Sequence, residues 1–174
     1  MTPEAAPRPA AERATPAIRL RPARETDVAS IVPLLLRLKR LNEEFDPLLK
    51  VRDDAEAQAE ETVRSQLSDP RSVVLVAEGS GADREKVVGF VRAMVRERPF
   101  YAPESEGVIV DIYLLPLYRR RGVGEYLLTE VSAALKAKGA GVVTAEFPAQ
   151  NEIAVRFYAK RGFRPVTSIH ARPL

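Results

Sequence analysis

The sequence has no cysteine and no tryptophan, and it has only one histidine. Without cysteine, the chain can form no disulfide, no thiolate nucleophile and no cysteine-bound metal site. The single histidine, His170, cannot form a histidine cluster, so we expect no metal and assign it to the surface of a last strand. No apolar run is long enough to cross a bilayer, and the first residues lack the apolar core of a secretory signal. The sequence therefore predicts a cytoplasmic protein without a membrane partner.

The composition is that of a globular protein. Of the 174 residues, 45% are hydrophobic and 29% are charged, and the net charge is +3. This excess is too small to require nucleic acid as a partner, and it suits a polyanionic cofactor equally well. Residues 1–16 are rich in alanine and proline, and we expect them to form a disordered tail. Residues 17–174 are long enough to form a single domain with its own core.

Hydrophobic periodicity and turn signals divide the chain into alternating elements. This order predicts an α/β (α+β) fold, in which a mixed sheet carries helices on both faces. The predicted elements are a strand at 17–21, helices at 25–41 and 53–67, strands at 73–77, 87–96 and 108–115, a helix at 125–138, a strand at 141–147, a helix at 151–161 and a strand at 163–171.

A glycine turn joins the apolar strand at 108–115 to the helix at 125–138. Within it stand Arg119-Arg120-Arg121-Gly122-Val123-Gly124, an Arg-x-x-Gly-x-Gly pattern. Glycine lets the backbone approach a ligand and adopt positive φ. The start of a helix offers unpaired N–H groups and partial positive charge. Together these features predict an anion site suited to a pyrophosphate.

Three kinds of glycine turn fit part of this pattern. A P-loop requires Gly-Lys-Ser/Thr at its end, which is absent here. A dinucleotide fingerprint requires a third small residue where this chain has Leu127, although Glu146 stands where its acidic residue belongs. That fingerprint also follows its strand directly, whereas residues 116–121 intervene here. The third kind is the pyrophosphate loop of an acyl-coenzyme A site.

A second motif favours this third interpretation. Asn151, Ala154, Tyr158, Gly162 and Phe163 form an Asn-x-x-Ala-x-x-x-Tyr-x-x-x-Gly-Phe pattern, about thirty residues after the glycine turn. Asn151 is a favourable N-cap, and Gly162 is a natural helix stop. The ordered pair of motifs resembles the GNAT superfamily of N-acetyltransferases, over Val108 to Phe163.

The resemblance implies a GNAT fold, with a mixed and mostly antiparallel sheet of about six to seven strands and helices on both faces. It implies an acyltransferase that moves an acetyl group from acetyl-coenzyme A directly to an amine, without a metal. The residues that it assigns to cofactor binding are Leu114, Arg119, Arg120, Arg121, Gly122, Val123, Gly124, Glu125, Asn151 and Tyr158. Leu114 would act through its backbone, and Asn151 would cap a helix, contact pantetheine, or do both.

The resemblance also implies catalytic roles. Tyr158 matches the family's general acid, and the alternative for an aromatic at this position is a place in the core. Some family members carry a glutamate base on the strand at 108–115, where this chain has valines. Glu146 has the spacing of the alternative base, acting through a water, although a carboxylate without a role is an equal alternative. Asp111 is the other candidate, but alternation turns it away from the cleft unless a bulge intervenes.

The acceptor would be a primary amine: a small-molecule amine, a polyamine, a lysine or a protein N-terminus. Two predicted loops, at 42–52 and 98–106, would form its site. Their acids, which could attract a cationic amine or simply be solvated, are Glu43, Glu44, Asp46, Glu104 and Glu106.

The alternative function is a non-catalytic coenzyme A-binding regulatory or assembly module. A nucleic-acid-binding role for the three arginines at 119–121 lacks a supporting aromatic platform or basic stripe. The sequence leaves a homodimer open.

Overall fold

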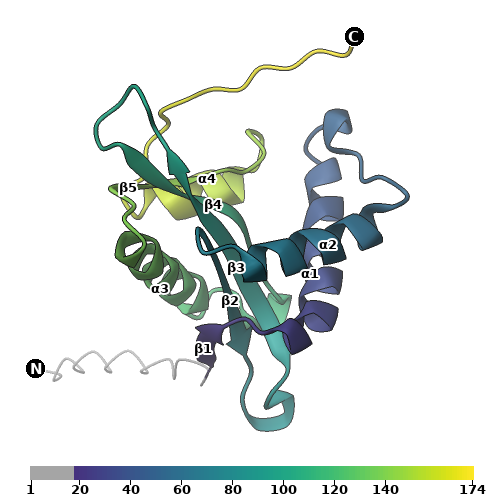
Figure 1. Cartoon of the computed structure of the whole chain (residues 1–174). Helices are drawn as coiled ribbons and strands as arrows, with labels where there is room; N and C mark the ends of the chain where they lie inside the picture. Colours follow the sequence, from purple (N-terminus) through teal and green to yellow (C-terminus); the bar gives the residue numbers. More distant parts are fainter. Residues whose placement is uncertain (1–17) are drawn as a thin grey trace, which may run out of the picture.

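A computed structural model describes residues 18–174 as one sheet covered by helices on both faces (Figure 1). The predicted N-terminal tail, 1–16, lies outside the described residues. Neighbouring strands run antiparallel except for the last pair, β4 and β5, which run parallel. The strands lie in the order β1 (Arg19–Pro22), β2 (Ser72–Glu78), β3 (Val87–Glu97), β4 (Ser105–Leu114) and β5 (Val142–Ala145).

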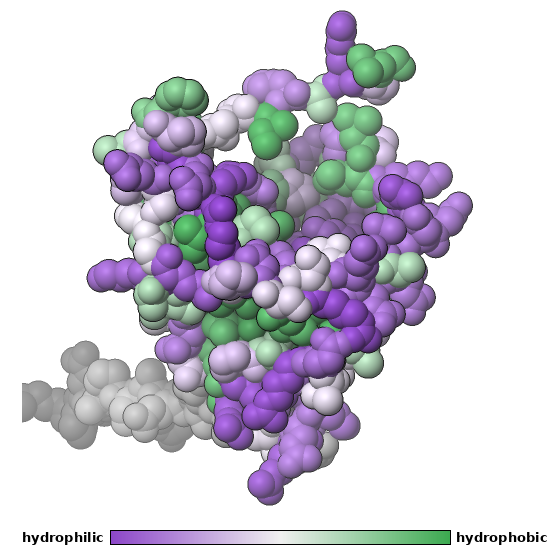
Figure 2. Space-filling view, viewed as in Figure 1, coloured by the Kyte–Doolittle hydropathy of each residue, from purple (hydrophilic) through white to green (hydrophobic). Residues whose placement is uncertain are grey.

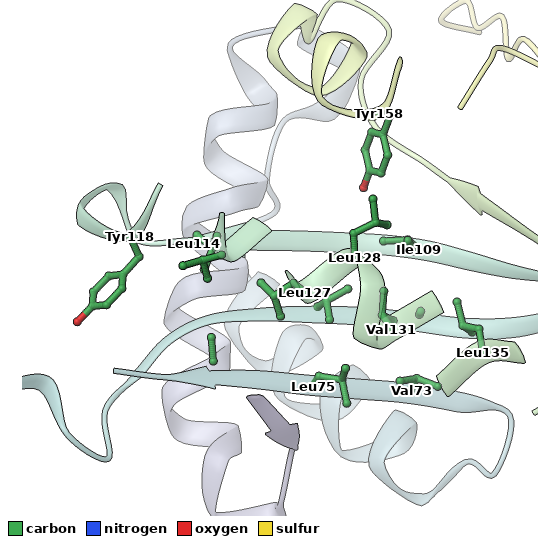
Figure 3. Close-up of a cluster of buried hydrophobic side chains, with 14 of the residues drawn as sticks. Val73, Leu75, Ile109, Leu114, Tyr118, Leu127, Leu128, Val131, Leu135 and Tyr158 are labelled. Atoms are coloured by element: carbon green, nitrogen blue, oxygen red, sulfur yellow. The ribbon is translucent and has the colours of Figure 1, made fainter. Parts of the chain in front are cut away.

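Two helices cover each face of the sheet (Figure 1). Alternation along β2 sends Val74 and Val76 into the core beneath the first helix pair, and Val73 and Leu75 into the core beneath the second. Figure 3 shows the second core, in which leucines and valines of the third helix lie over β2. The pairs are α1 (Val28–Glu43) with α2 (Ala55–Ser68), and α3 (Val123–Ala137) with α4 (Glu152–Ala159).

The predicted fold class is confirmed, but the strand predicted at 163–171 is wrong. Its residues are extended yet pair with no described strand, and β5 is the edge of a five-stranded sheet. The chain leaves α4 through Gly162, whose φ is +82°. Pro165 then removes one ladder donor, and its ring holds Arg164 extended. The segment therefore has strand-like residues without a strand beside it.

A one-residue bulge interrupts β4 where it pairs with β3. Arg92 lies opposite Asp111 and Ala93 lies opposite Ile109, so Val110 is the extra residue. A bulge shifts the alternation of side chains by one position. As a result, Ile109 packs into the α3–α4 core while Asp111 lies on the α1 side.

Asp111 joins α1 to the middle of the sheet through a buried ion cluster. Its side chain is 2% exposed, and Lys39 of α1 donates to Oδ1 at 2.6 Å. Arg92 of β3 donates to Oδ2 from Nε at 3.0 Å and from Nη2 at 2.6 Å. The Nη1 group of Arg92 is buried without a partner in the described part of the chain. Because both cations share one carboxylate, the cluster depends on Asp111.

We therefore predict that Asp111→Asn destabilises the protein strongly. Removing one partner of a buried pair leaves an uncompensated charge, here Arg92, and typically costs about 3–5 kcal/mol. Lys39→Met should cost no more than about 1 kcal/mol, because the lysine side chain is 40% exposed and water can replace its partner. Urea unfolding at pH 7 measures both. Equal losses in the two variants would show that the cluster does not depend on Asp111.

Candidate functional site

The loop from β4 to α3 has the backbone geometry of an anion site. Arg120 and Gly122 have positive φ, at 59° and 79°. Such a conformation is unusual for a non-glycine residue such as Arg120. A turn that contains left-handed residues can bring successive backbone N–H groups together around an anion. The first helical bond runs from the N–H of Tyr126 to the carbonyl of Gly122 at 3.0 Å. The N–H groups of the first three residues of α3 therefore keep no helical acceptor.

The three predicted arginines have different surroundings. Arg119 donates from Nε to the carbonyl of Leu114 at 2.9 Å, and its guanidinium lies 5.2 Å from the ring centre of Tyr113. It is thereby folded back against β4. Arg120 and Arg121 are exposed, and neither forms an ion pair with any residue from 18 to 174. Arg119 is exposed too and forms no ion pair in this range, but its bond to the Leu114 carbonyl leaves the other two side chains freer to meet an incoming polyanion.

The start of α3 is fastened to α4. The carboxylate of Glu125 accepts from Nη2 of Arg161 at 3.0 Å, so its negative charge at the anion site is compensated. The Arg161 guanidinium also lies 4.0 Å from the ring centre of Phe157. A Cβ on Gly124 would stand 3.2 Å from the Phe157 ring. Gly124 therefore has a packing reason to be glycine, beyond the predicted approach to a phosphate.

Past the bulge at Val110, β4 forms no backbone hydrogen bonds on the side where β5 lies. Pairing between the two strands ends at Ile109 and Ala145, and the N–H of Glu146 makes a last bond to the Ile109 carbonyl at 3.0 Å. Leu115 donates to the Val88 carbonyl at 2.9 Å, toward β3. Because backbone groups alternate along a strand, the N–H of the preceding residue, Leu114, faces the open side. This is the backbone donor that the sequence analysis singled out.

Tyr158 lies in an aromatic cluster between α4 and β4. Its ring stacks on Phe147 with centres 5.1 Å apart, and it meets Phe157 and Phe163 at the same distance. Figure 3 shows its hydroxyl directed toward Leu128 and the sheet. Burial raises the pKa of Tyr158 well above its usual value, and the negative charge of Asp111 raises it further. The hydroxyl therefore carries its proton at neutral pH, as an ordinary tyrosine does, and its raised pKa makes release of that proton costlier than from an exposed tyrosine.

Asn151 caps α4 as predicted. Its Oδ1 accepts from the N–H of Ala154 at 3.0 Å, which satisfies one of the free donors of the first turn. This bond uses only the oxygen of the side-chain amide. The nitrogen is left for a further contact.

The two predicted carboxylates, Glu146 and Asp111, differ in their exposure to solvent and in their ion partners. Glu146 stands where β4 and β5 separate, is 48% exposed and bonds Arg96 at 3.3 Å. Both oxygens of Asp111 are held, one by the partly exposed Lys39 and the other by the buried Arg92. The bulge in β4, which the sequence left undecided, is present. It directs the side chain of Asp111 to the ion cluster on the α1 side, away from the open side of β4. Glu146 is the carboxylate that can reach solvent.

The acids predicted to line an acceptor site have mostly local uses. Glu43 accepts the backbone N–H of Val51, and Asp46 caps a short 3-10 helix through a 2.8 Å bond from Leu48. Glu106 lies on β4, not in a loop, and bonds Arg96 at 2.9 Å. Glu44 and Glu104 are exposed at the surface.

Sequence reasoning missed the cations behind the site, Lys39, Arg92 and Arg96. Arg92 had a signal, because it is a charge inside an otherwise apolar strand. Lys39 and Arg96 had none, since a lysine on a helix and an arginine at a strand end are ordinary surface residues. Phe147 was assigned only to a strand, and its stacking on Tyr158 depends on how the chain returns through α4.

The described residues show no metal site and no membrane-spanning helix, and one further hollow lies elsewhere on the surface. Within residues 18–174, no three acidic or histidine side chains gather so as to hold a metal ion. None of the helices in this range is both long and apolar enough to cross a membrane. A shallow hollow on α1, lined by residues such as Pro33, Arg37 and Glu44, lies apart from Tyr158 and the glycine loop.

Solved acetyltransferases share this architecture. A predicted acetyltransferase from Clostridium acetobutylicum with acetyl-CoA has a TM-score of 0.73 at 15% identity, over 90% of this chain and 96% of that one. The aminoglycoside N-acetyltransferase AAC(6')-Iy in complex with CoA has a TM-score of 0.70 at 18% identity, over 91% and 95%. A ribosomal-protein-alanine N-acetyltransferase from Brucella melitensis has a TM-score of 0.68 at 18% identity, over 91% and 100%. At these identities the likeness shows the fold alone.

No curated protein matches the chain by sequence. The family model of the acetyltransferase (GNAT) family, however, matches residues 37–163, which include the glycine loop, both candidate carboxylates and Tyr158. This range is well over half of the chain. The protein therefore belongs to the GNAT family of acetyltransferases.

Proposed function

We propose that the protein transfers the acetyl group of acetyl-coenzyme A to a primary amine. The observation that carries this proposal is the continuity of three features. The amides at the start of α3 follow the open side of β4 along the chain, and α4, which carries Tyr158, contacts the start of α3 through Phe157 and lies against Phe147, just past the end of β5. An anion site, a free backbone donor and a proton donor are what acyl transfer from a large anionic thioester requires.

The residues fit the cosubstrate. The amides from Arg120 to Glu125 would hold its pyrophosphate, because they lack backbone acceptors and lie at the positive end of α3. The exposed guanidinium groups of Arg120 and Arg121 add positive charge there. The side-chain nitrogen of Asn151 would hold the pantetheine arm, and the N–H of Leu114 would meet the thioester at its end. The bound cosubstrate supplies the acetyl group as a thioester.

Three groups of the chain would then serve the transfer. Glu146 accepts a proton from the ammonium form of the acceptor through a water, which leaves the amine neutral and nucleophilic. The N–H of Leu114 stabilises negative charge on the acetyl oxygen. As the carbon–nitrogen bond forms, the nitrogen loses its second proton to solvent. The hydroxyl of Tyr158 donates its proton to the sulfur as the carbon–sulfur bond breaks. Proton exchange with solvent then returns Glu146 and Tyr158 to their starting protonation states.

The acceptor class rests on the charges near Glu146. One arginine, Arg96, bonds two carboxylates, Glu106 and Glu146, so this cluster keeps a net negative charge. A negative cluster favours the approach of a protonated amine. Among the similar structures are N-acetyltransferases of an aminoglycoside and of a ribosomal-protein alanine, and both of these acceptors carry amines. We infer a small-molecule or peptide amine for this protein.

The first prediction tests the anion site. Acetyl-coenzyme A at one hundred times its dissociation constant should stabilise the wild type by about 2.7 kcal/mol, or several degrees in Tm. Gly122→Glu should abolish this shift, because it places bulk and negative charge at the converging amides. Gly139→Glu is the matched control, because Gly139 also has positive φ and open space around it but lies at the other end of α3. A shift that survives in Gly122→Glu would contradict the loop assignment.

The second prediction tests the proton donor. Tyr158→Phe keeps the aromatic stacking and removes the hydroxyl, so kcat should fall about a hundredfold or more while affinity for acetyl-coenzyme A stays nearly unchanged. Release of free thiol measures turnover. The wild type should also keep its kcat up to about pH 10, where an ordinary tyrosine begins to ionise, because burial raises the pKa of Tyr158. Full turnover in Tyr158→Phe would return this residue to a packing role.

The third prediction tests the base. Glu146→Gln should lower kcat/KM most near neutral pH, and activity should partly recover at high pH, where the amine is already neutral. Arg96→Gln is a useful companion, because it removes the ion partner of Glu146 and keeps the carboxylate. It should lower activity less. If Glu146→Gln has the pH profile of the wild type, the acceptor loses its proton directly to solvent.

A further inference from the structure

The turn between β2 and β3 is tied to the glycine loop by a side-chain hydrogen bond. This turn spans residues 79–86 and contains a short 3-10 helix, Gly81–Asp83. The hydroxyl of Tyr118 donates to Oδ2 of Asp83 at 2.7 Å. In Figure 1 the turn forms the lower end of the molecule, and Figure 2 shows mostly hydrophilic side chains there. A surface turn thus holds the residue that directly precedes Arg119.

Tyr118 is fixed by its ring, its backbone and its hydroxyl. It ends a second 3-10 helix, Pro116–Tyr118, and is 8% exposed. Its ring belongs to the core beneath α3, and Figure 3 shows its hydroxyl directed away from the labelled core residues. Its N–H donates to the Leu115 carbonyl at 2.9 Å. The bond to Asp83 is therefore the outermost of three attachments of this residue.

Gly79 leaves the room that this bond requires. A Cβ on Gly79 would stand 2.8 Å from the hydroxyl oxygen of Tyr118, and equally close to the Cβ and the carbonyl oxygen of Asp83. Real Cβ atoms do not approach other heavy atoms so closely. Gly79 does not have positive φ, so its backbone conformation gives no reason for glycine. The close approach of Tyr118 and Asp83 is the reason that the structure shows.

Both partners are in the protonation states that the bond requires. Asp83 also accepts from Nζ of Lys86 at 3.1 Å, through its other oxygen. The bond from Tyr118, and to a lesser degree that from Lys86, lowers the pKa of Asp83. The same bond to Asp83 raises the pKa of Tyr118. At neutral pH a protonated hydroxyl therefore meets an ionised carboxylate, and hydrogen bonds of this kind are shorter and stronger than neutral ones.

The glycine loop is held mainly at its two ends. The N–H of Arg119 bonds the Pro116 carbonyl at 3.2 Å, but within the described chain the N–H groups from Arg120 to Glu125 have no backbone acceptor. The second end of the loop is fastened to α4 through the contacts of Gly124 and Glu125. The first end is Tyr118. The direction of the free amides therefore depends on how firmly Tyr118 is held.

We propose that Asp83 is a positioning residue for the cosubstrate. It holds the hydroxyl of Tyr118, Tyr118 holds the first end of the glycine loop, and the loop amides converge before acetyl-coenzyme A arrives. The inference rests on the proposed function, because it assigns the loop to that ligand. A loop that is already in its binding conformation binds more tightly, since no affinity is lost in selecting that conformation. Asp83 acts through Tyr118 and is not itself catalytic.

Calorimetric titration with coenzyme A tests the link directly. Asp83→Ala removes the acceptor, and Tyr118→Phe removes the donor but keeps the ring. Each should raise the dissociation constant about tenfold, as expected if the loop has its binding conformation about one tenth of the time. The double variant should bind no more weakly than either single variant, because both changes remove the same bond. Wild-type affinity in both single variants would overturn the proposal.

Two further variants separate the bond from the turn around it. Asp83→Asn keeps an oxygen that can accept from Tyr118, so it should recover part of the lost affinity. Lys86→Met removes the other partner of Asp83 and leaves the Tyr118 bond in place, so it should bind coenzyme A like the wild type. An equal loss of affinity in Lys86→Met and Asp83→Ala would show that the whole turn matters and would overturn the specific role of Asp83.

Steady-state turnover distinguishes positioning from catalysis and from general stability. In Asp83→Ala and Tyr118→Phe, KM for acetyl-coenzyme A should rise while kcat at saturation stays near that of the wild type, because Tyr158 and Glu146 are held by other elements. Urea unfolding of the same variants reports their stability separately. A lower kcat with an unchanged KM, or a loss of stability alone, would contradict the proposal.

Backbone amide shifts of the free protein test the link without any ligand. In ¹⁵N-labelled Asp83→Ala, the amides from Arg120 to Gly124 should move from their wild-type positions, and in Lys86→Met they should stay. Loop amides that do not move in Asp83→Ala would overturn the inference. If the wild type binds no coenzyme A, the proposed function fails, and these shifts still decide whether Asp83 holds the loop.

Discussion

The bulge at Val110 is the constraint on which the site depends. It shifts the alternation of β4 by one residue, so that Ile109 packs under α3 and Asp111 lies under α1. Pairing with β5 ends at the same place, at Ile109 and Ala145. From there to Leu114, β4 has a neighbour only on the side of β3. The backbone donors in this stretch that face away from β3 are therefore left free.

The ion cluster of Asp111 holds β4 in place where the strand has no hydrogen bonds to β5. Breaking a ladder removes hydrogen bonds between β4 and β5, and β4 has to be held in place by other contacts. Lys39 and Arg92 provide them from α1 and β3. The charge of Asp111 also acts on Tyr158, whose pKa it raises. Asp111, a structural carboxylate, thus raises the pKa of the proton donor Tyr158 although it has no contact with the acceptor amine.

The anion site and the proton donor form one rigid unit. The close approach of Phe157 to Gly124 and the ion pair between Glu125 and Arg161 fasten α4 to the start of α3. Tyr158 stands next to Phe157 on α4, so its distance from the glycine loop is set by this contact. Catalysis by positioning requires such fixed distances between the group that holds the substrate and the group that reacts.

The parts of the site that local sequence determines could be predicted. The glycine loop, the cap at Asn151 and the helical position of Tyr158 depend on residues close in the chain, and all lie as expected. The burial of Asp111 could not be predicted, because a bulge depends on the partner strand. The use of Glu43 and Asp46 as local acceptors depends on loop geometry. The strand expected after Phe163 has the right residues, but no described strand pairs with it.

The central claim is that the amides at the start of α3 and the open side of β4 hold acetyl-coenzyme A. The most direct measurement is a titration of the ¹⁵N-labelled protein with coenzyme A, followed through its backbone amide shifts. The amides from Arg120 to Glu125 and that of Leu114 should move together and saturate at one ligand per chain, while those along the hollow of α1 at Pro33 and Arg37 stay still. Shifts confined to α1, or a loop that does not respond, would contradict the account.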